Sequence, residues 1–176
     1  AAASISGPKM RLIDAPPAGI QTYVNGELLE SREPLHTFDV TLQTISDNLL
    51  PTQRQTKVHV YAVRPGETAH IYEMGLPVVE TGDQWHYDVQ QRVPVNWERN
   101  NVPPAYLKAL RVAVLNALHD QIPQEQAEAS WVSIATADPR CEPEAVKTVV
   151  RQRFGEKVVI NDPSDAEGTK IAVSKG

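Results

Sequence analysis

The chain is organised around Val93-Pro94-Val95-Asn96-Trp97-Glu98-Arg99-Asn100-Asn101-Val102-Pro103-Pro104, which joins a predicted strand to the longest predicted helix. Before it, Trp85 to Val93 alternates large and polar residues with a period of two, which is typical of a strand with one buried face. After it, Pro103 and Pro104 suit the first turn of a helix, where no amide partner is lost. The polar residues between them, Asn96 to Asn101, form either a solvated loop or a junction with a chemical role.

Composition places the chain among ordinary globular proteins, with 176 residues of which 41% are hydrophobic and 22% charged. The formal net charge of −5 gives no strong attraction to DNA, although a local basic patch stays open. No run approaches the roughly 20 apolar residues of a membrane span. Cys141 is the only cysteine, which excludes an internal disulfide and favours a cytoplasmic protein whose thiol is incidental.

Alternating segments predict several strands before the central stretch. Asn25-Gly26 is the strongest short hairpin signal, and it joins residues 20–24 to residues 27–29. The other predicted strands are Thr37–Leu42, Lys57–Val63, Thr68–Glu73 and Trp85–Val93. The residues from Met74 to Glu80 include a glycine and a proline in an apolar run, which predicts a bulge or an edge strand.

The turn signal Arg64-Pro65-Gly66-Glu67 lies between two of these strands and predicts that they form a hairpin. In that register Val60 lies opposite Ile71, and Tyr61 lies opposite His70. Three histidines, His59, His70 and His86, fall on the predicted strands. We interpret them as strand-surface residues and predict no metal site, because no further convergent ligand is present.

The second half of the chain predicts helices. Residues 105–121 carry Leu107, Leu110, Val114 and Leu118 at helical spacing, which predicts a helix lying on the sheet. A second helix begins at Pro123 and carries Ala127, Trp131, Ile134 and Ala135. A third covers Pro143–Phe154, with Val146, Val149, Val150 and Phe154 buried and Gly155 as its stop. A short strand at residues 157–160 and a helix at residues 165–174 follow, and we expect the natural chain to continue beyond Gly176.

Common catalytic motifs are missing from the sequence: GxxxxGK[ST], GxGxxG, GxSxG and HExxH do not occur. The polar candidates for a site are Arg99 with Asn96 at the junction, and Lys57 at the start of a predicted strand. A guanidinium and an ammonium group beside backbone amides suit a phosphate. The same groups also occur on any protein surface.

The segment Val93-Pro94-Val95-Asn96-Trp97-Glu98-Arg99 resembles the Leu-Pro-Leu-Asn-Ile-Ser-Arg segment that closes a strand in the middle domain of the ninety-kilodalton heat-shock chaperones. The corresponding domain of the GHKL ATPase superfamily, which includes gyrase B and MutL, is called the transducer and has the ribosomal-S5-like fold. The residues from Ile71 to Val78, the Asn25-Gly26 hairpin and the helix after Arg99 fit the same arrangement. The chain is also similar to predicted ATP-binding proteins of this superfamily from bacteria and phages.

The resemblance implies roles for the candidate site residues. Arg99 matches the chaperone arginine that reaches the terminal phosphate of ATP, and Asn96 matches its supporting asparagine. Lys57, in Gln55-Thr56-Lys57, is similar to the lysine of the Gln-Thr-Lys loop of gyrase-type transducers, which contacts the same phosphate. Glu98 stands where the chaperone pattern has serine, and its carboxylate could pair with the Arg99 guanidinium.

The resemblance also implies an organisation for the chain. Residues 1–18 are a linker or tail, residues 19–122 an S5-like transducer domain, and residues 123–176 a helical extension. The expected fold is α+β, with a mixed or antiparallel sheet covered by helices and a C-terminal extension of helices and a short strand. Expected partners are an N-terminal nucleotide-binding domain of the same polypeptide and a second copy in a homodimer.

Two functions of different classes follow from these observations. The first is a transducer fragment that contacts the γ-phosphate of ATP held by another domain and relays its closure. No cofactor and no activity are expected for this chain alone, whereas ATP and magnesium are expected in the parent protein. The second is a non-enzymatic α+β module that binds a protein or a nucleic acid. The presence of ExxxNxxDA and DxGxG motifs upstream in the same coding sequence would distinguish the first function from the second.

Overall fold

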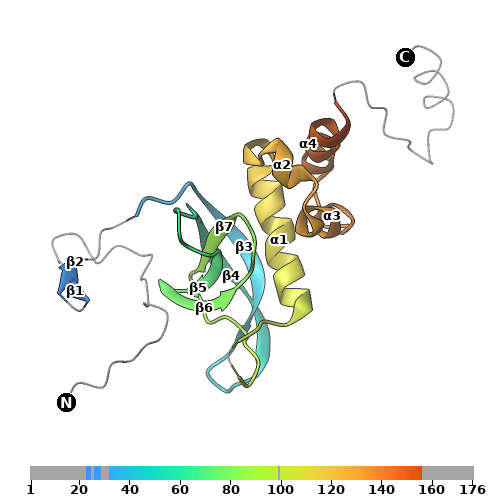
Figure 1. Ribbon diagram of the computed structural model, residues 1–176. Helices are drawn as coiled ribbons and strands as arrows, with labels where there is room; N and C mark the ends of the chain where they lie inside the picture. Colours follow the sequence, from blue (N-terminus) through green and yellow to red (C-terminus); the bar gives the residue numbers. More distant parts are fainter. Residues whose placement is uncertain (1–22, 25, 29–31, 99, 156–176) are drawn as a thin grey trace, which may run out of the picture. The chain divides into compact units, whose positions relative to one another are not determined.

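The computed structural model describes residues 23–24, 26–28, 32–98 and 100–155. By its internal contacts the chain divides into two compact units, Ala1–Leu107 and Lys108–Gly176. The boundary falls in the first turn of helix α1 (Pro104–Leu118). The fold is α+β, as the sequence predicts, and Figure 1 shows its strands and helices in chain order. The predicted domain boundary after residue 122 stays a prediction.

The first unit contains a small hairpin and a five-stranded sheet. Strands β1 (Tyr23–Val24) and β2 (Glu27–Leu28) pair antiparallel around Gly26, whose φ of 83° suits a tight turn, so the predicted hairpin is confirmed. The larger sheet has the order β3-β4-β7-β5-β6. Its strands are β3 (His36–Ile45), β4 (Pro51–Ala62), β5 (His70–Glu73), β6 (Leu76–Glu80) and β7 (Trp85–Val89).

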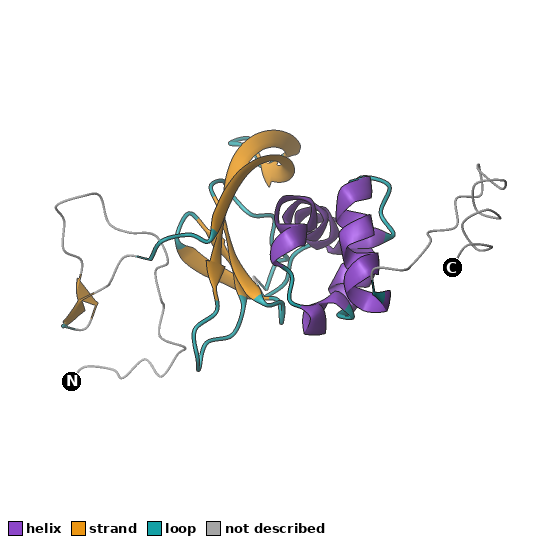
Figure 2. Ribbon diagram, turned by 90° about the horizontal axis from the view of Figure 1, so that it is seen from above, coloured by secondary structure: helices purple, strands orange, loops and turns teal. Residues whose placement is uncertain are grey.

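Strands β3 and β4 are the longest strands of the sheet and form a hairpin. They pair antiparallel over their whole length, with Asp39 opposite Lys57 and Leu42 opposite Arg54. Figure 2 shows that this hairpin is strongly twisted and curved. The polar segment Gln53–Thr56 is part of β4 and pairs with β3.

The predicted hairpin of β4 and β5 is wrong. β7 lies between these strands, so that Val60 is opposite Tyr87 in β7, and β5 runs parallel to β7 with Ile71 also opposite Tyr87. The turn itself is present, because the Glu67 amide donates to the Arg64 carbonyl at 3.0 Å. A local turn signal predicts that the chain reverses direction, but it cannot show that a later strand pairs between the two strands that flank the turn.

Strand β7 is buried on both faces, so the prediction of one buried face is also wrong. A central strand is covered on both sides, which makes its polar residues costly unless they are hydrogen-bonded. Asp88 meets this requirement because its carboxylate accepts from the Gly75 amide at 2.8 Å and from Gln90 Nε2 at 2.7 Å. The predicted edge strand is confirmed: β6 ends the sheet, and its pairing with β5 shifts register beside Pro77.

The second unit is helical. After α1 come a 3₁₀ turn η1 (His119–Gln121) and the helices α2 (Gln124–Ala127), α3 (Ser130–Thr136) and α4 (Pro143–Phe154). Helix α4 contacts α2 and η1, and Gln152 Nε2 donates to the Ile122 carbonyl at 2.8 Å. Asp138 accepts from Arg140 Nε at 2.9 Å and from Lys108 Nζ at 3.0 Å, and the Arg140 guanidinium holds the pKa of this carboxyl well below its usual range.

The helix predictions are largely confirmed. Helix α1 begins at Pro104 and α4 has the predicted bounds, with Gly155 following at a φ of 85°. The predicted second helix is two helices, and Ile134 is exposed, whereas Trp131 is buried. Phe154 is exposed as well, because the buried face of α4 centres on Ala145 and Val149. The predicted strand at residues 157–160 and helix at residues 165–174 lie outside the described residues.

Candidate functional site

Lys57 projects from the middle of β4, which places this predicted site residue within a strand and not in a loop. Its Nζ lies 3.1 Å from Oδ2 and 3.2 Å from Oδ1 of Asp39, its cross-strand neighbour. The two side chains are 57% and 52% exposed. An ion pair this accessible to water contributes about 0–1 kcal/mol, so the ammonium group is available to a stronger anionic partner.

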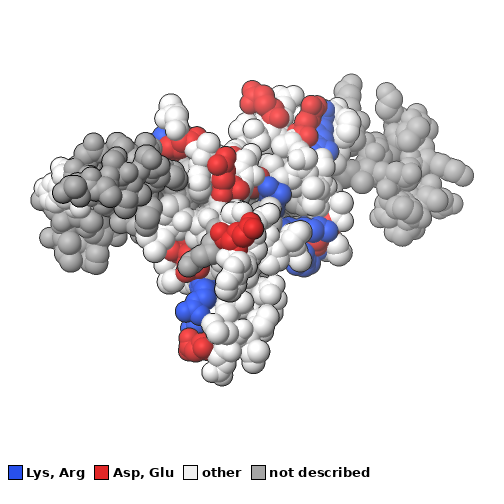
Figure 3. Space-filling model, turned by 60° about the horizontal axis from the view of Figure 1, so that its bottom comes forward, with Lys and Arg blue, Asp and Glu red and all other residues white. Residues whose placement is uncertain are grey.

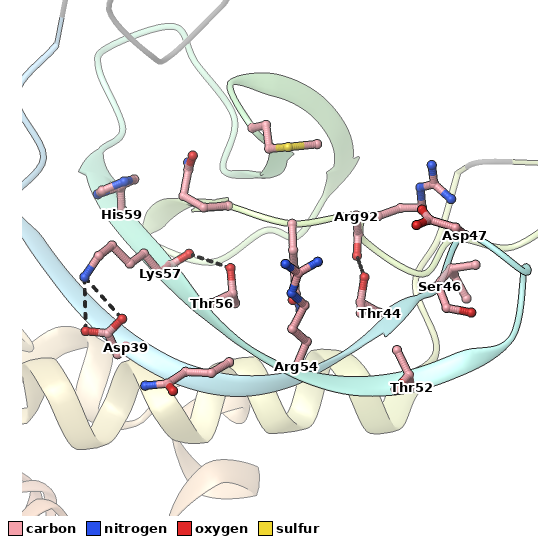
Figure 4. A pocket seen from close by; sticks show the side chains of 15 residues that line it. Asp39, Thr44, Ser46, Asp47, Thr52, Arg54, Thr56, Lys57, His59 and Arg92 are labelled. Carbon is pink, nitrogen blue, oxygen red and sulfur yellow. Dashed lines mark hydrogen bonds and ion pairs between the residues drawn. The ribbon is translucent and has the colours of Figure 1, made fainter.

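A broad, open groove of about 870 Å³ runs along β4 and includes Lys57 in its wall. Two further cations, Arg54 on β4 and Arg92 after β7, line it together with Gln55, Gln90 and several hydroxyl-bearing side chains. Figure 4 shows the Lys57 and Asp39 pair toward one end of the groove, with Arg54 extending into its middle. Such a wall of cations, amides and hydroxyls can bind anionic or strongly polar groups.

Neither Arg54 nor Arg92 has an ion-pair partner within the described part of the chain. Both side chains are exposed. Neither arginine was predicted as a site residue, because neither belongs to a recognised motif: Arg54 precedes Gln55-Thr56-Lys57, and Arg92 lies near the end of a predicted strand. The pairing of β3 with β4 places Arg54 opposite Leu42. Neither this register nor the position of Arg92 in the groove can be read from a local sequence pattern.

Asn96 organises the loop between β7 and α1 and does not line the groove. Its Oδ1 accepts from the amides of Asn100 at 3.0 Å and Asn101 at 3.2 Å, and its Nδ2 donates to Asn100 Oδ1 at 2.7 Å. These bonds are typical of an asparagine that stabilises a turn. The predicted role of Asn96 beside a phosphate stays a prediction.

Arg99 lies outside the described residues, so its predicted role as phosphate sensor also stays a prediction. The Glu98 carboxylate accepts from Asn100 Nδ2 at 2.9 Å. Trp97 is 99% exposed, which leaves a large aromatic surface in contact with solvent beside these residues.

The three strand histidines do not converge on a metal site. Among the residues that the structure describes, no group of three or more His, Cys, Asp or Glu side chains is placed to hold a metal ion. His59 Nδ1 lies 2.7 Å from Thr37 Oγ1, and His70 Nδ1 lies 2.7 Å from the Thr68 carbonyl oxygen. The interpretation of His86 as a surface residue is wrong, because its side chain is buried on β7.

His86 belongs to a buried ionic network. Its Nε2 lies 3.1 Å from Oε2 of Glu67, and the same oxygen is 3.2 Å from Arg32 Nη1. The backbone amide of His70 donates to His86 Nδ1 at 3.2 Å, so both ring nitrogens are occupied. Burial lowers the pKa of His86, and the hydrogen bond to Glu67 opposes this effect only in part. We therefore infer that this network stabilises the sheet.

The single thiol is poorly suited to nucleophilic chemistry. Burial raises the pKa of Cys141, and the carboxylates of Asp138 and Glu142 raise it further. Since the thiolate is the nucleophile, the reactive fraction at neutral pH is small.

Comparison with protein-family models, with curated proteins and with solved structures finds no match to this chain. In the described part of the chain, no helix combines the length and apolar character needed to span a membrane. The resemblance to GHKL transducers therefore depends on the short motifs of the sequence and stays a prediction.

Proposed function

We propose that the chain is a transducer-type domain of a larger GHKL-like ATPase and that the groove along β4 receives the terminal phosphate of the nucleotide. The observation that carries this proposal is the position of Lys57, an accessible ammonium group in the wall of a groove that also contains Arg54 and Arg92, whose guanidinium groups form no ion pair with the described residues. Phosphoryl transfer needs neutralisation of charge more than it needs covalent chemistry, so positioned cations contribute directly to the rate.

The Lys57–Asp39 pair gives this site a simple mode of action. In the resting domain the carboxylate of Asp39 holds the ammonium group over the strand. A terminal phosphate carries more negative charge than one carboxylate, and it would attract the lysine when the nucleotide-binding domain closes on the groove. ATP and magnesium would be supplied by that N-terminal domain of the same cytoplasmic polypeptide. Arg99 would approach the phosphate from the loop before α1.

Replacing the proposed sensors in the intact parent protein tests this function. We expect Lys57→Ala and Arg99→Ala each to reduce kcat roughly tenfold to a thousandfold, with a small effect on KM, because the contacts form mainly as the domains close. A matched control is Lys147→Ala, which removes an exposed lysine that pairs with Glu144 at 2.7 Å on α4. The proposal is wrong if both sensor variants hydrolyse ATP at the parental rate.

A protein-binding module is the second candidate function, and the exposure of Trp97 favours it. Tryptophan is enriched at the centres of protein interfaces, and this side chain is 99% exposed. A nucleic-acid partner has less support, because Figure 3 shows acidic residues interspersed with basic ones on the face in view. A coding sequence that lacks ExxxNxxDA and DxGxG motifs upstream of this chain would favour the binding module.

A further inference from the structure

The second edge of β4 is unpaired over about half of the strand. On one side, β4 pairs with β3 from Pro51 to Val60. On the other side it pairs with β7 only from Val58 to Ala62, and the Gln90 amide adds one bond to the Lys57 carbonyl at 2.9 Å. Within the described residues no strand continues this pairing toward Pro51. An exposed strand edge of this kind is a template for another strand.

The geometry of the sheet identifies which backbone groups are open. In an extended strand the N–H and C=O of one residue point to the same side, and the side alternates along the chain. Since the Lys57 carbonyl points toward β7, the amide and carbonyl groups of Gln55 and Gln53 point to the same edge. Both glutamines are exposed.

The chain after β7 leaves this edge instead of covering it. Gln91 Nε2 donates to the Leu42 carbonyl at 3.3 Å, and Thr44 Oγ1 donates to the Arg92 carbonyl at 2.7 Å. The two hairpin residues that make these bonds, Leu42 and Thr44, both belong to β3 and not to β4. The segment of Gln91 and Arg92 therefore crosses the face of the hairpin. The groove of about 870 Å³ is the space that remains beside β4.

The charged side chains that line the groove are three cations, Lys57, Arg54 and Arg92, and two carboxylates, Asp39 and Asp47. Asp39 pairs with Lys57, so the cations outnumber the carboxylates beside the open edge. Arg54 extends into the groove, and Arg92 lies on its opposite wall (Figure 4). Neither has an ion-pair partner among the residues that the structure describes. Two copies of this chain paired edge to edge would set two β4 strands side by side, each carrying Arg54 on one face and Lys57 on the other, and like charges on paired strands are destabilising. The edge therefore disfavours self-association and favours an acidic strand.

We propose that an extended acidic segment of another protein adds to the sheet as a sixth strand, pairing with Gln53 and Gln55 of β4 while its carboxylates bind Arg54 and Arg92. Main-chain hydrogen bonds would supply much of the affinity, and the two arginines would select for acidic side chains. This inference goes beyond the proposed function, because it assigns Arg54 and Arg92 to a protein partner, whereas Lys57 is the proposed contact of the phosphate, and because it requires no nucleotide.

Titration of the full 176-residue chain with a designed peptide tests the inference. The probe is a peptide of about eight residues that alternates glutamate and valine, a length sufficient for one strand. We expect chemical-shift changes along residues 51–57 and slowed hydrogen exchange at the amides of Gln53 and Gln55. Arg54→Gln and Arg92→Gln should each weaken binding roughly tenfold to a hundredfold, as expected for the loss of a charge-assisted hydrogen bond.

Three controls separate strand addition from other kinds of binding. Arg64→Gln removes an exposed arginine from the turn before β5 and should leave binding unchanged. A lysine–valine peptide, and the acidic peptide N-methylated at alternate residues, should both fail to bind. The inference is overturned if the N-methylated or basic peptide binds as well as the probe. It is also overturned if inorganic triphosphate binds at Arg54 and Arg92 while the peptide does not, or if the amides of Gln53 and Gln55 gain no protection.

These readouts are independent of the proposed ATPase role. A parent protein with normal turnover after Lys57→Ala would contradict the phosphate-sensing function and leave the peptide measurements unaffected. A chain that shows no strand addition would contradict the present inference and leave the turnover measurements unaffected.

Discussion

At the scale of single residues, the sheet depends on polar side chains that are buried and mutually satisfied. The side chains of Arg32 and Glu67 are 10% and 6% exposed, and His86 is 1% exposed. Glu67 also accepts from the Arg64 amide at 3.0 Å, so this one carboxylate connects the start of the sheet, the β4–β5 turn and the central strand. Removing one partner of a buried pair leaves an uncompensated polar group, which makes such networks sensitive points.

His86 should make the stability of the first unit depend on pH. Its folded-state pKa lies below the ordinary value of 6.5, mainly because burial disfavours the charged ring, with Arg32 and His70 adding positive charge nearby. Just below pH 6.5 the unfolded chain therefore binds a proton that the folded chain does not bind. The contribution of His86 to stability is complete above that pH and decreases as the pH falls toward the folded-state pKa. Urea unfolding followed between pH 8 and pH 5 measures this loss.

A substitution pair isolates the contribution of His86 to this pH dependence. In His86→Gln the decline in unfolding free energy below pH 6.5 should be shallower than in the parent, because the titrating ring is gone. His59→Gln, made on the neighbouring strand where the ring is only half-buried, should retain the parental slope. Equal slopes in the parent and in His86→Gln would show that other groups govern the acid response.

Only some of the residues in the candidate site could be selected from the sequence. Lys57 could be selected because it belongs to a short motif and carries a charge in a strand. Arg54 and Arg92 could not be selected in this way, because they are far apart in the sequence. They come close only through the pairing of β3, β4 and β7 and through the path of the chain at Gln91. For Asn96 the structure adds a role that the sequence did not indicate, because its bonds to Asn100 and Asn101 stabilise its own loop. Its role beside a phosphate, which the resemblance implies, stays a prediction.

At the scale of elements, helices were easier to predict than strand order. A helix is defined by contacts within its own residues, so spacing, the proline at its start and the glycine after its end fix α4 at Pro143–Phe154. Strand order depends on pairing between distant segments. Every residue of β7 is buried, and a strand that is buried on both faces suits the centre of a sheet. The hydrogen bonds of His86 and Asp88 make their burial in this strand possible.

The buried stripe of α1 gives a prediction at this scale. Leu110 is 0% exposed, so Leu110→Ala should lower the unfolding free energy by about 2–5 kcal/mol through lost burial and the cavity left behind. Leu107→Ala, on the half-buried flank of the same helix, should have a smaller effect. Chemical denaturation of both variants measures the difference. A change within about 0.5 kcal/mol for Leu110→Ala would be typical of a surface site and would contradict this assignment.

At the scale of the whole molecule, the charge and the groove together define the kind of ligand that the chain can bind. The net charge of −5 disfavours long polyanions, whereas the groove, whose lining has three cations against the two carboxylates of Asp39 and Asp47, favours a short, concentrated anion or an acidic strand. The groove is wide and open, and its cations lie on a strand, Arg54 and Lys57, and on the segment after β7, Arg92, not in a glycine-rich loop or at the N-terminus of a helix. Sites that bind nucleotides tightly enclose the phosphates with backbone amides.

This difference leads to a prediction for the isolated chain. The sequence contains no phosphate-cradling loop, and the cations of the groove stand on an open surface where water screens them. Calorimetric titration with ATP-Mg should therefore show no saturable heat at concentrations up to about 1 mM, which corresponds to a binding free energy weaker than about −4 kcal/mol. The parent protein, with its nucleotide-binding domain, should bind ATP in the same assay. Saturable binding to the isolated chain would mean that the groove alone recognises the nucleotide, and a sensor that depends on a second domain would then be the wrong description of Lys57.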